Sequence, residues 1–258
     1  MELFVIIILG IVQGLTEFLP VSSSGHLVLL ENIFGVSENK VFLNVVLHFA
    51  TLIAVVIFYR KKLWNIVKHP FQPITAHLAI ATAITCAIVL IFPDFFESTF
   101  NGRFLSWGFI LSAIFLFSTE WISRKYEKEK YPYTKIWDRQ AILLGVFQGL
   151  AILPGVSRSG TTLCAGIVMG VEKKDALDFS FLMSVPIILA SVIYELVKCK
   201  FQLLITDINA IELGIGGITA FICAILGIKL MLKIVEKVQY KWFAIYLLIL
   251  AYITFIVI

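Results

Sequence analysis

The chain alternates between long apolar runs and short polar breaks. Six runs are long enough to cross a membrane as helices, which takes about 20 residues each. They lie at 41–59, 74–92, 104–122, 178–197, 208–228 and 242–258. Four shorter runs lie at about 2–19, 22–34, 139–153 and 160–171. The pattern predicts an all-α polytopic membrane protein with six spanning helices and four shorter helices.

The shorter runs form two pairs, and each pair is divided by a turn that contains proline and several serines. The turns are PVSSSGH at 20–26 and PGVSRSG at 154–160. Proline interrupts a helix, and serine caps the start of the next one. Each pair is therefore predicted to be a re-entrant helical hairpin. Such backbone is tolerated at membrane depth only where protein or a water-filled cavity surrounds it.

The two hairpins are copies of one sequence. GIVQGLTEFLPVSSSG at 10–25 and GVFQGLAILPGVSRSG at 145–160 share eight of sixteen positions at a constant offset of 135. We therefore expect one integral membrane domain over 1–258, with repeat 1 at about 1–122, repeat 2 at about 139–258 and a cytoplasmic connection at 123–138. Paired broken helices in two such halves point to a binding site at the interface between the repeats.

Composition supports a membrane protein. The chain is 60% hydrophobic and 15% charged, whereas soluble domains carry about 25% charged residues. Lipid must therefore contact much of its surface, and membrane lipids are expected partners. No basic stripe interleaved with aromatic residues is present, so no nucleic-acid partner is expected.

The positive charges predict the orientation. Of the 21 Lys and Arg residues, 16 lie in the segments 60–73, 123–139, 173–174 and 229–241. Four lie in the connections of the opposite side, and Arg158 lies inside a hairpin turn. The positive-inside rule places the 16 in the cytoplasm. Both termini then face outward, and the two halves form inverted-topology repeats, with the first hairpin opening to the outside.

The first repeat carries an acid at membrane depth. Gln13 and Glu17 are spaced i,i+4 and share one helix face. A carboxylate within the membrane is costly and is a functional candidate by default; the alternative is an acid that reaches interfacial water. Ser23 and His26 follow in the turn, and His48 in the segment 41–59 is a further candidate for the same cavity.

The second turn carries Arg158, the most unusual charge in the chain. Its planar guanidinium suits bidentate binding of a phosphate; the alternative is an ion pair with Glu17, which is also a plausible resting state of an anion site. Hydroxyl and backbone N–H groups at a helix start favour anions as well. Capping alone would explain at least one of Ser22, Ser23 and Ser24. The candidate phosphate ligands are Arg158, Ser22, Ser24, Ser157, Ser159, Gly160 and Thr161.

These motifs resemble a known family. QGLTEFLPVSSSGH at 13–26, LHFATLIAVVIFYRKK at 47–62 and PGVSRSG at 154–160 are similar to the signature regions of bacterial undecaprenyl-pyrophosphate phosphatases of the bacitracin-resistance type. The resemblance extends over essentially the whole chain.

The resemblance implies a multi-pass enzyme of the bacterial cytoplasmic membrane, for which a homodimer is a possible assembly. Its substrate would be a polyprenyl pyrophosphate, hydrolysed to the monophosphate at the outer face to recycle the lipid carrier for cell-wall synthesis. By position, Ser23 and His26 match the family's catalytic serine and histidine, and Arg158 matches its phosphate-binding arginine. Gln13 and Glu17 match a motif associated with a divalent cation, Mg²⁺ or Ca²⁺, although some members have Glu where Gln13 stands.

Two alternatives remain open. Within the enzyme reading, Ser23 is the nucleophile with His26 as its acid/base partner, or water attacks directly and Ser23 only positions the phosphate. From a different class, a transporter or flippase of polyprenyl phosphates would share the broken helices and the inverted repeats. Such a transporter needs an anion site but no acid/base group, so the set of Glu17, Ser23 and His26 favours the enzyme.

Overall fold

The computed structural model describes residues 3–36, 40–99, 102, 104–129, 135–198, 208–237 and 239–258. Every regular element in these residues is a helix. The helices are α1 (Leu3–Phe18), α2 (Ser23–Ile33), α3 (Lys40–Phe58), α4 (Arg60–Lys68), α5 (Pro73–Ile91), α6 (Pro93–Thr99), α7 (Leu105–Glu129), α8 (Asp138–Leu150), α9 (Arg158–Val168), α10 (Lys173–Lys198), α11 (Ala210–Val235) and α12 (Tyr240–Val257).

The six predicted spanning helices are confirmed. Among the described residues, α3, α5, α7, α10, α11 and α12 are long and apolar enough to cross a membrane. The four short runs form α1, α2, α8 and α9, and α1 ends two residues before Pro20. That these short helices enter and leave the membrane on one side, and that the two halves have opposite orientations, stay predictions.

Several boundaries differ from those that the apolar runs predict. Helix α7 continues to Glu129 rather than ending at 122, α10 begins at Lys173, and α11 continues to Val235. These extensions are rich in Lys, Glu and Arg, which favour helix in water, so a helix does not end where its apolar stretch ends. The basic segment 60–73, which joins two of the predicted spanning helices, contains α4. Of the residues in the charge count, Arg103, Lys130 and Lys200 lie outside the described residues.

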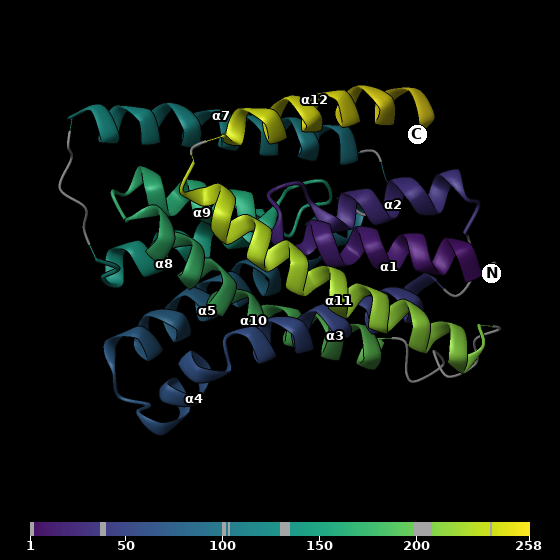
Figure 1. Ribbon diagram of the computed structural model, residues 1–258, viewed down its shortest axis with the longest axis horizontal. Helices are drawn as coiled ribbons and strands as arrows, with labels where there is room; N and C mark the ends of the chain where they lie inside the picture. Colours follow the sequence, from purple (N-terminus) through teal and green to yellow (C-terminus); the bar gives the residue numbers. More distant parts are fainter. Residues whose placement is uncertain are drawn as a thin grey trace.

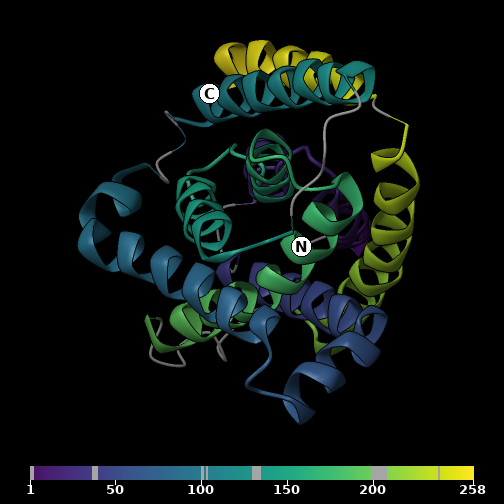
Figure 2. The same cartoon turned by 90° about the vertical axis from the view of Figure 1, so that its left-hand side faces the viewer.

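The longer helices enclose the shorter ones. Figure 2, which looks along the long axis, shows α1, α2, α8 and α9 toward the middle, with α7 and α12 on one side and α3, α5, α10 and α11 around the rest. Helix α9 is almost fully buried from Ser159 to Ile167. The two polar turns are therefore largely surrounded by protein, whereas α1 and α8 keep exposed apolar side chains such as Phe4 and Ile142.

A short helix of each half of the sequence packs against a long helix of the other half. Helix α1 packs along α11 of the second half, and α8 of the second half packs along α5 of the first. Equivalent glycines make both contacts possible. A Cβ on Gly10 would lie 2.8 Å from the carbonyl oxygen of Gly216, and one on Gly145 would lie 2.6 Å from that of Ala81. The repeated glycines therefore permit close helix packing.

The predicted cytoplasmic segments meet at one end of the molecule. Lys62 pairs with Asp178, Lys173 pairs with Glu127, and the backbone N–H of Lys241 donates to Glu120. In Figure 1 both chain ends lie toward the opposite end, at the right. All five tryptophans are 61–68% exposed, as the aromatic belts of a membrane protein require.

Candidate active site

The two Ser-rich turns have the same local construction. Ser22 caps α2, and its Oγ accepts a hydrogen bond from the Gly25 N–H at 3.3 Å. Ser157 caps α9 in the same way, accepting from the Gly160 N–H at 3.2 Å. The capping role expected for at least one of the first three serines is confirmed for Ser22. The Ser157 hydroxyl and the Gly160 N–H, both expected phosphate ligands, are paired with each other.

The backbone of the first turn is strained. Ser22 has a φ of 68°, the one positive φ at a non-glycine position in the described chain. Such conformations cost of order 1–3 kcal/mol and cluster at functional sites. The strained residue lies in the turn between Glu17 and Ser23, two side chains that hydrogen-bond to each other.

The two turns are in direct contact. The Ser159 Oγ donates to the carbonyl oxygen of Leu19 at 2.9 Å, and a Cβ on Gly160 would lie 3.2 Å from Cβ of Pro20. Ser24 lies 3.4 Å from Ser22 and Ser159 lies 3.3 Å from Ser157, measured between Oγ atoms. The two repeats therefore bring their polar turns to one place.

Glu17 lies at the centre of the contact between the two turns. Its side chain is nearly fully buried. The Gln13 Nε2 donates to Oε2 at 2.9 Å, and the Ser23 Oγ donates to the same oxygen at 2.6 Å. The Arg158 Nη2 donates to Oε1 in a salt bridge. The ion pair considered from the sequence is thus present, and it joins the two repeats.

His48 also faces this carboxylate. Its Nε2 lies 4.0 Å from the Glu17 Oε2, and its Nδ1 lies 2.8 Å from the carbonyl oxygen of Asn44. Because a carbonyl oxygen only accepts, the Nδ1 carries the hydrogen. His48, a candidate for the same site, therefore lies beside the Glu17 carboxylate.

His26 has other partners. Its Nδ1 lies 2.7 Å from the carbonyl oxygen of Ser22, and its Nε2 lies 2.7 Å from the hydroxyl of Tyr246 on α12. Both ring nitrogens are therefore occupied, while the Ser23 hydroxyl turns to Glu17. The structure does not bring His26 and Ser23 together as a hydrogen-bonded pair. Tyr246 was not found by sequence reasoning, because a tyrosine in an apolar run has no distinguishing signal.

Three buried polar atoms at the site have no protein partner. They are the Gln13 Oε1, the Arg158 Nη1 and the Thr161 Oγ1. Leaving buried polar groups unpaired costs about 1–3 kcal/mol each. Gln13 and Arg158 both donate to Glu17, so their unpaired atoms indicate a place for a ligand at this carboxylate. A guanidinium nitrogen and a hydroxyl suit an anion, and an amide oxygen beside a carboxylate suits a hard cation. The described residues hold no group of three or more His, Cys, Asp or Glu able to bind a metal alone.

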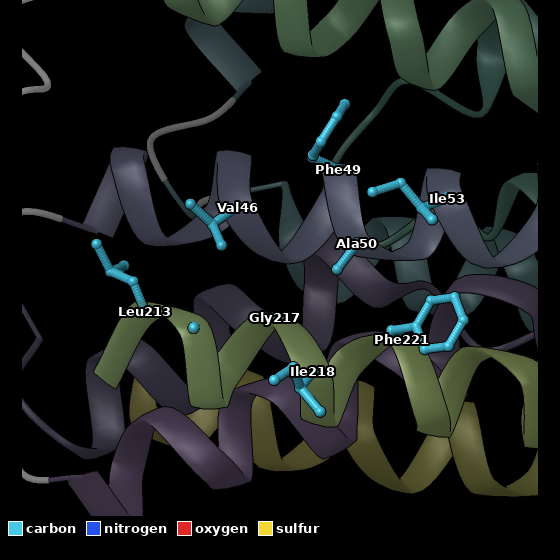
Figure 3. A pocket seen from close by; sticks show the side chains of 9 residues that line it. Val46, Phe49, Ala50, Ile53, Leu213, Gly217, Ile218 and Phe221 are labelled. Carbon is cyan, nitrogen blue, oxygen red and sulfur yellow. The ribbon is translucent and has the colours of Figure 1, made fainter. Parts of the chain in front are cut away.

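An apolar groove lies beside the helices that carry this site. It has a volume of about 370 Å³ and runs between α3 and α11. Figure 3 shows Val46, Phe49, Ala50 and Ile53 on one wall and Leu213, Gly217, Ile218 and Phe221 on the other. The α3 wall belongs to the helix of His48, and the α11 wall packs on α1, which carries Gln13 and Glu17.

The chain is similar to known proteins over almost its whole length. The chain is 37% identical to an undecaprenyl-diphosphatase of Carboxydothermus hydrogenoformans over 252 residues, which covers 97% of this chain and 95% of that protein. It is 39% identical to an undecaprenyl-diphosphatase of Methanococcus vannielii over 247 residues, covering 93% and 94%. The model of the family described as bacitracin resistance protein BacA matches residues 6–253. The chain therefore belongs to the BacA family of multi-pass membrane proteins.

Proposed function

We propose that this protein hydrolyses undecaprenyl pyrophosphate to undecaprenyl phosphate and inorganic phosphate. The observation that carries the proposal is the arrangement of Ser23, Glu17 and Arg158, in which a nucleophile, a proton acceptor and a partly unpaired guanidinium meet inside an apolar protein. The names of the relatives support the same reaction. The proposed setting is the outer face of the bacterial cytoplasmic membrane, where the product re-enters cell-wall synthesis and its supply confers bacitracin resistance.

Arg158 binds the terminal phosphate in this proposal. One nitrogen of its guanidinium holds Glu17, and the buried Nη1 is left to donate to a phosphate oxygen. The Thr161 hydroxyl is a second free group of the same turn. Donors fixed in advance at a site that excludes water stabilise the charge on a transferred phosphoryl group more than water does.

Ser23 attacks the terminal phosphorus. A bond forms between its Oγ and phosphorus, and the bond from phosphorus to the bridging oxygen breaks, so polyprenyl phosphate leaves with that electron pair. The serine proton passes to Glu17, which already accepts it in a hydrogen bond of 2.6 Å. This differs from the sequence expectation, in which His26 takes the proton, because the Ser23 hydroxyl donates to Glu17 and no hydrogen bond joins it to His26 in the described structure.

Water then cleaves the phosphoserine. His26 lies three residues after Ser23 on the same helix face, and its Nε2 carries a lone pair when Nδ1 donates to the Ser22 carbonyl oxygen. We assign His26 the proton of this water, as general base. Water bonds to phosphorus and the bond between phosphorus and the serine oxygen breaks. The serine oxygen takes back the proton held by Glu17, and inorganic phosphate leaves with the proton that His26 received.

The residues also fit a divalent cation. The unpaired Oε1 of Gln13 and the carboxylate of Glu17 are oxygen donors of the kind that Mg²⁺ and Ca²⁺ prefer. These two residues would hold the ion together with phosphate oxygens and water. When bound, it would supply positive charge that neutralises the pyrophosphate.

The polyprenyl chain lies, in this proposal, in the groove between α3 and α11. The groove is lined by apolar side chains and glycine, and it lies at the middle of α3 and in the N-terminal half of α11. The positive-inside rule predicts that the N-terminal ends of both helices face outward. This supports a lipid chain that extends from the bilayer midplane into the outer leaflet.

The rival function is a transporter or flippase of polyprenyl phosphates. Release of inorganic phosphate from undecaprenyl pyrophosphate by purified protein in detergent, with and without a chelator, separates the two. No membrane gradient exists in detergent, so sustained turnover supports the phosphatase. Tight binding of the lipid without phosphate release would instead favour transport.

A further inference from the structure

His26 is held by a residue from the other half of the chain. The Tyr246 hydroxyl on α12 lies 2.7 Å from the His26 Nε2 on α2. The two rings are stacked, with centroids 5.6 Å apart and planes inclined by 19°. Phe109 contacts the same imidazole edge-on, at a centroid distance of 5.9 Å. The ring is therefore fixed in position and in rotation about its axis.

The two hydrogen bonds also determine which ring nitrogen carries the hydrogen. The carbonyl oxygen of Ser22 can only accept, so Nδ1 must donate to it at 2.7 Å. In a neutral imidazole, Nε2 then has the free lone pair, and the Tyr246 hydroxyl donates to it. A basic nitrogen is thereby directed away from the α2 backbone and toward α12.

The surroundings of Tyr246 make this pairing specific. Tyr246 is 42% exposed, and its neighbours Ile245, Leu248 and Ile249 on α12 are exposed apolar residues. In hydrocarbon a phenolic hydroxyl finds no water to bond. The imidazole is the partner that the structure provides for it.

We propose that Tyr246 serves His26 in phosphoserine hydrolysis: its ring fixes the imidazole plane, and its hydroxyl connects the basic Nε2 to the attacking water. The inference rests on the proposed function of His26. It adds Tyr246 of repeat 2 to the contacts of His26, whose partners Ser22 and Phe109 belong to repeat 1. Because the Tyr246 hydroxyl covers the single lone pair of Nε2, the hydroxyl passes its own proton to Nε2 and takes one from the water. The tyrosine oxygen then accepts from the new N–H, so the contact persists through the step.

The first test is Tyr246→Phe, which keeps the stacked ring and removes only the hydroxyl. We expect kcat for phosphate release to fall about tenfold, as for loss of one buried hydrogen bond, with KM and the thermal midpoint unchanged. The matched control is Tyr252→Phe on the same helix. Tyr252 is 69% exposed, and its hydroxyl has no hydrogen-bond partner in the described part of the chain. Wild-type kcat in Tyr246→Phe would overturn the proposal.

A double-mutant cycle asks whether Tyr246 acts through His26. Adding Tyr246→Phe to His26→Ala should cause no further loss of kcat, because the group that the hydroxyl positions is gone. An equal tenfold loss in both backgrounds would show that the hydroxyl acts elsewhere, and would overturn the inference.

A spectroscopic measurement separates this inference from the proposed function. In protein labelled with ¹⁵N-histidine, the His26 resonance is identified by its absence in His26→Ala. We expect its Nε2 to shift in Tyr246→Phe and to stay in place in Tyr252→Phe. An unchanged Nε2 resonance refutes the Tyr246 contact. Absence of phosphate release from the wild type refutes the proposed reaction instead, whatever the resonance does.

Discussion

Arg158 offers the sharpest test of the site, because its two terminal nitrogens have different tasks. Nη2 binds Glu17, and Nη1 is buried without a protein partner. A lysine ammonium keeps the charge but is a single point donor and cannot serve both directions in the plane of a guanidinium. Arg158→Lys should therefore keep the ion pair with Glu17 and lose the donor that faces the phosphate.

The magnitude follows from that missing donor. Loss of one preorganised donor to a developing charge costs about 10²–10³-fold in kcat, or ~2.7–4 kcal/mol. Stability should respond differently. Arg158→Lys should unfold near the wild-type temperature, whereas Arg158→Ala leaves the Glu17 carboxylate buried without its counter-charge. Breaking a buried ion pair in this way costs ~3–5 kcal/mol.

The assay measures phosphate release and thermal unfolding on the same detergent preparations. Arg158→Ala combined with Glu17→Gln is the control, because it removes both charges; it should recover stability while remaining inactive. If Arg158→Lys turned over at the wild-type rate and Arg158→Ala only lowered stability, the role of Arg158 would be to stabilise the contact between the repeats. The proposal that Arg158 binds the terminal phosphate would then be wrong.

Three further predictions concern the nucleophile, the lipid chain and the orientation. Rapid quench with substrate labelled in the terminal phosphate should leave label on the protein, and Ser23→Ala should abolish both label and turnover; unlabelled protein together with an active Ser23→Ala would identify water as the nucleophile. Gly214→Leu should fill the groove without a clash, because a Cβ on Gly214 would meet nothing within 4 Å. It should raise KM about fivefold for undecaprenyl pyrophosphate and leave KM for the shorter farnesyl pyrophosphate unchanged. Gly214→Ala is the control, and an equal change of KM for both lipids would exclude the groove as the binding site of the chain. In a background without native cysteines, a cysteine at Lys40 should react with an impermeant thiol reagent in intact cells and one at Lys61 or Lys128 should not; reversed reactivity would refute the orientation.

The sequence by itself determined the helices and the position of the chemistry along them. Spanning helices are readable because each must present about 20 apolar residues to lipid, and the broken helices are readable because proline and serine act locally on the backbone. The repeat at 10–25 and 145–160 also showed that the two turns belong together. Helix ends were less predictable, as in α7 and α10, since a helix can leave the membrane without changing its backbone.

Only the tertiary structure decided which side chains pair. Ser23 and His26 are close in the sequence, yet the hydroxyl donates to Glu17 and the imidazole contacts Tyr246, which is 220 residues away. Glu17 receives Arg158 from the other repeat because α1 and α8 each pack against a helix of the opposite half. Hydrogen-bond partners depend on side-chain direction within about an ångström, and sequence spacing along one helix cannot report a direction that is set by helices packed around it.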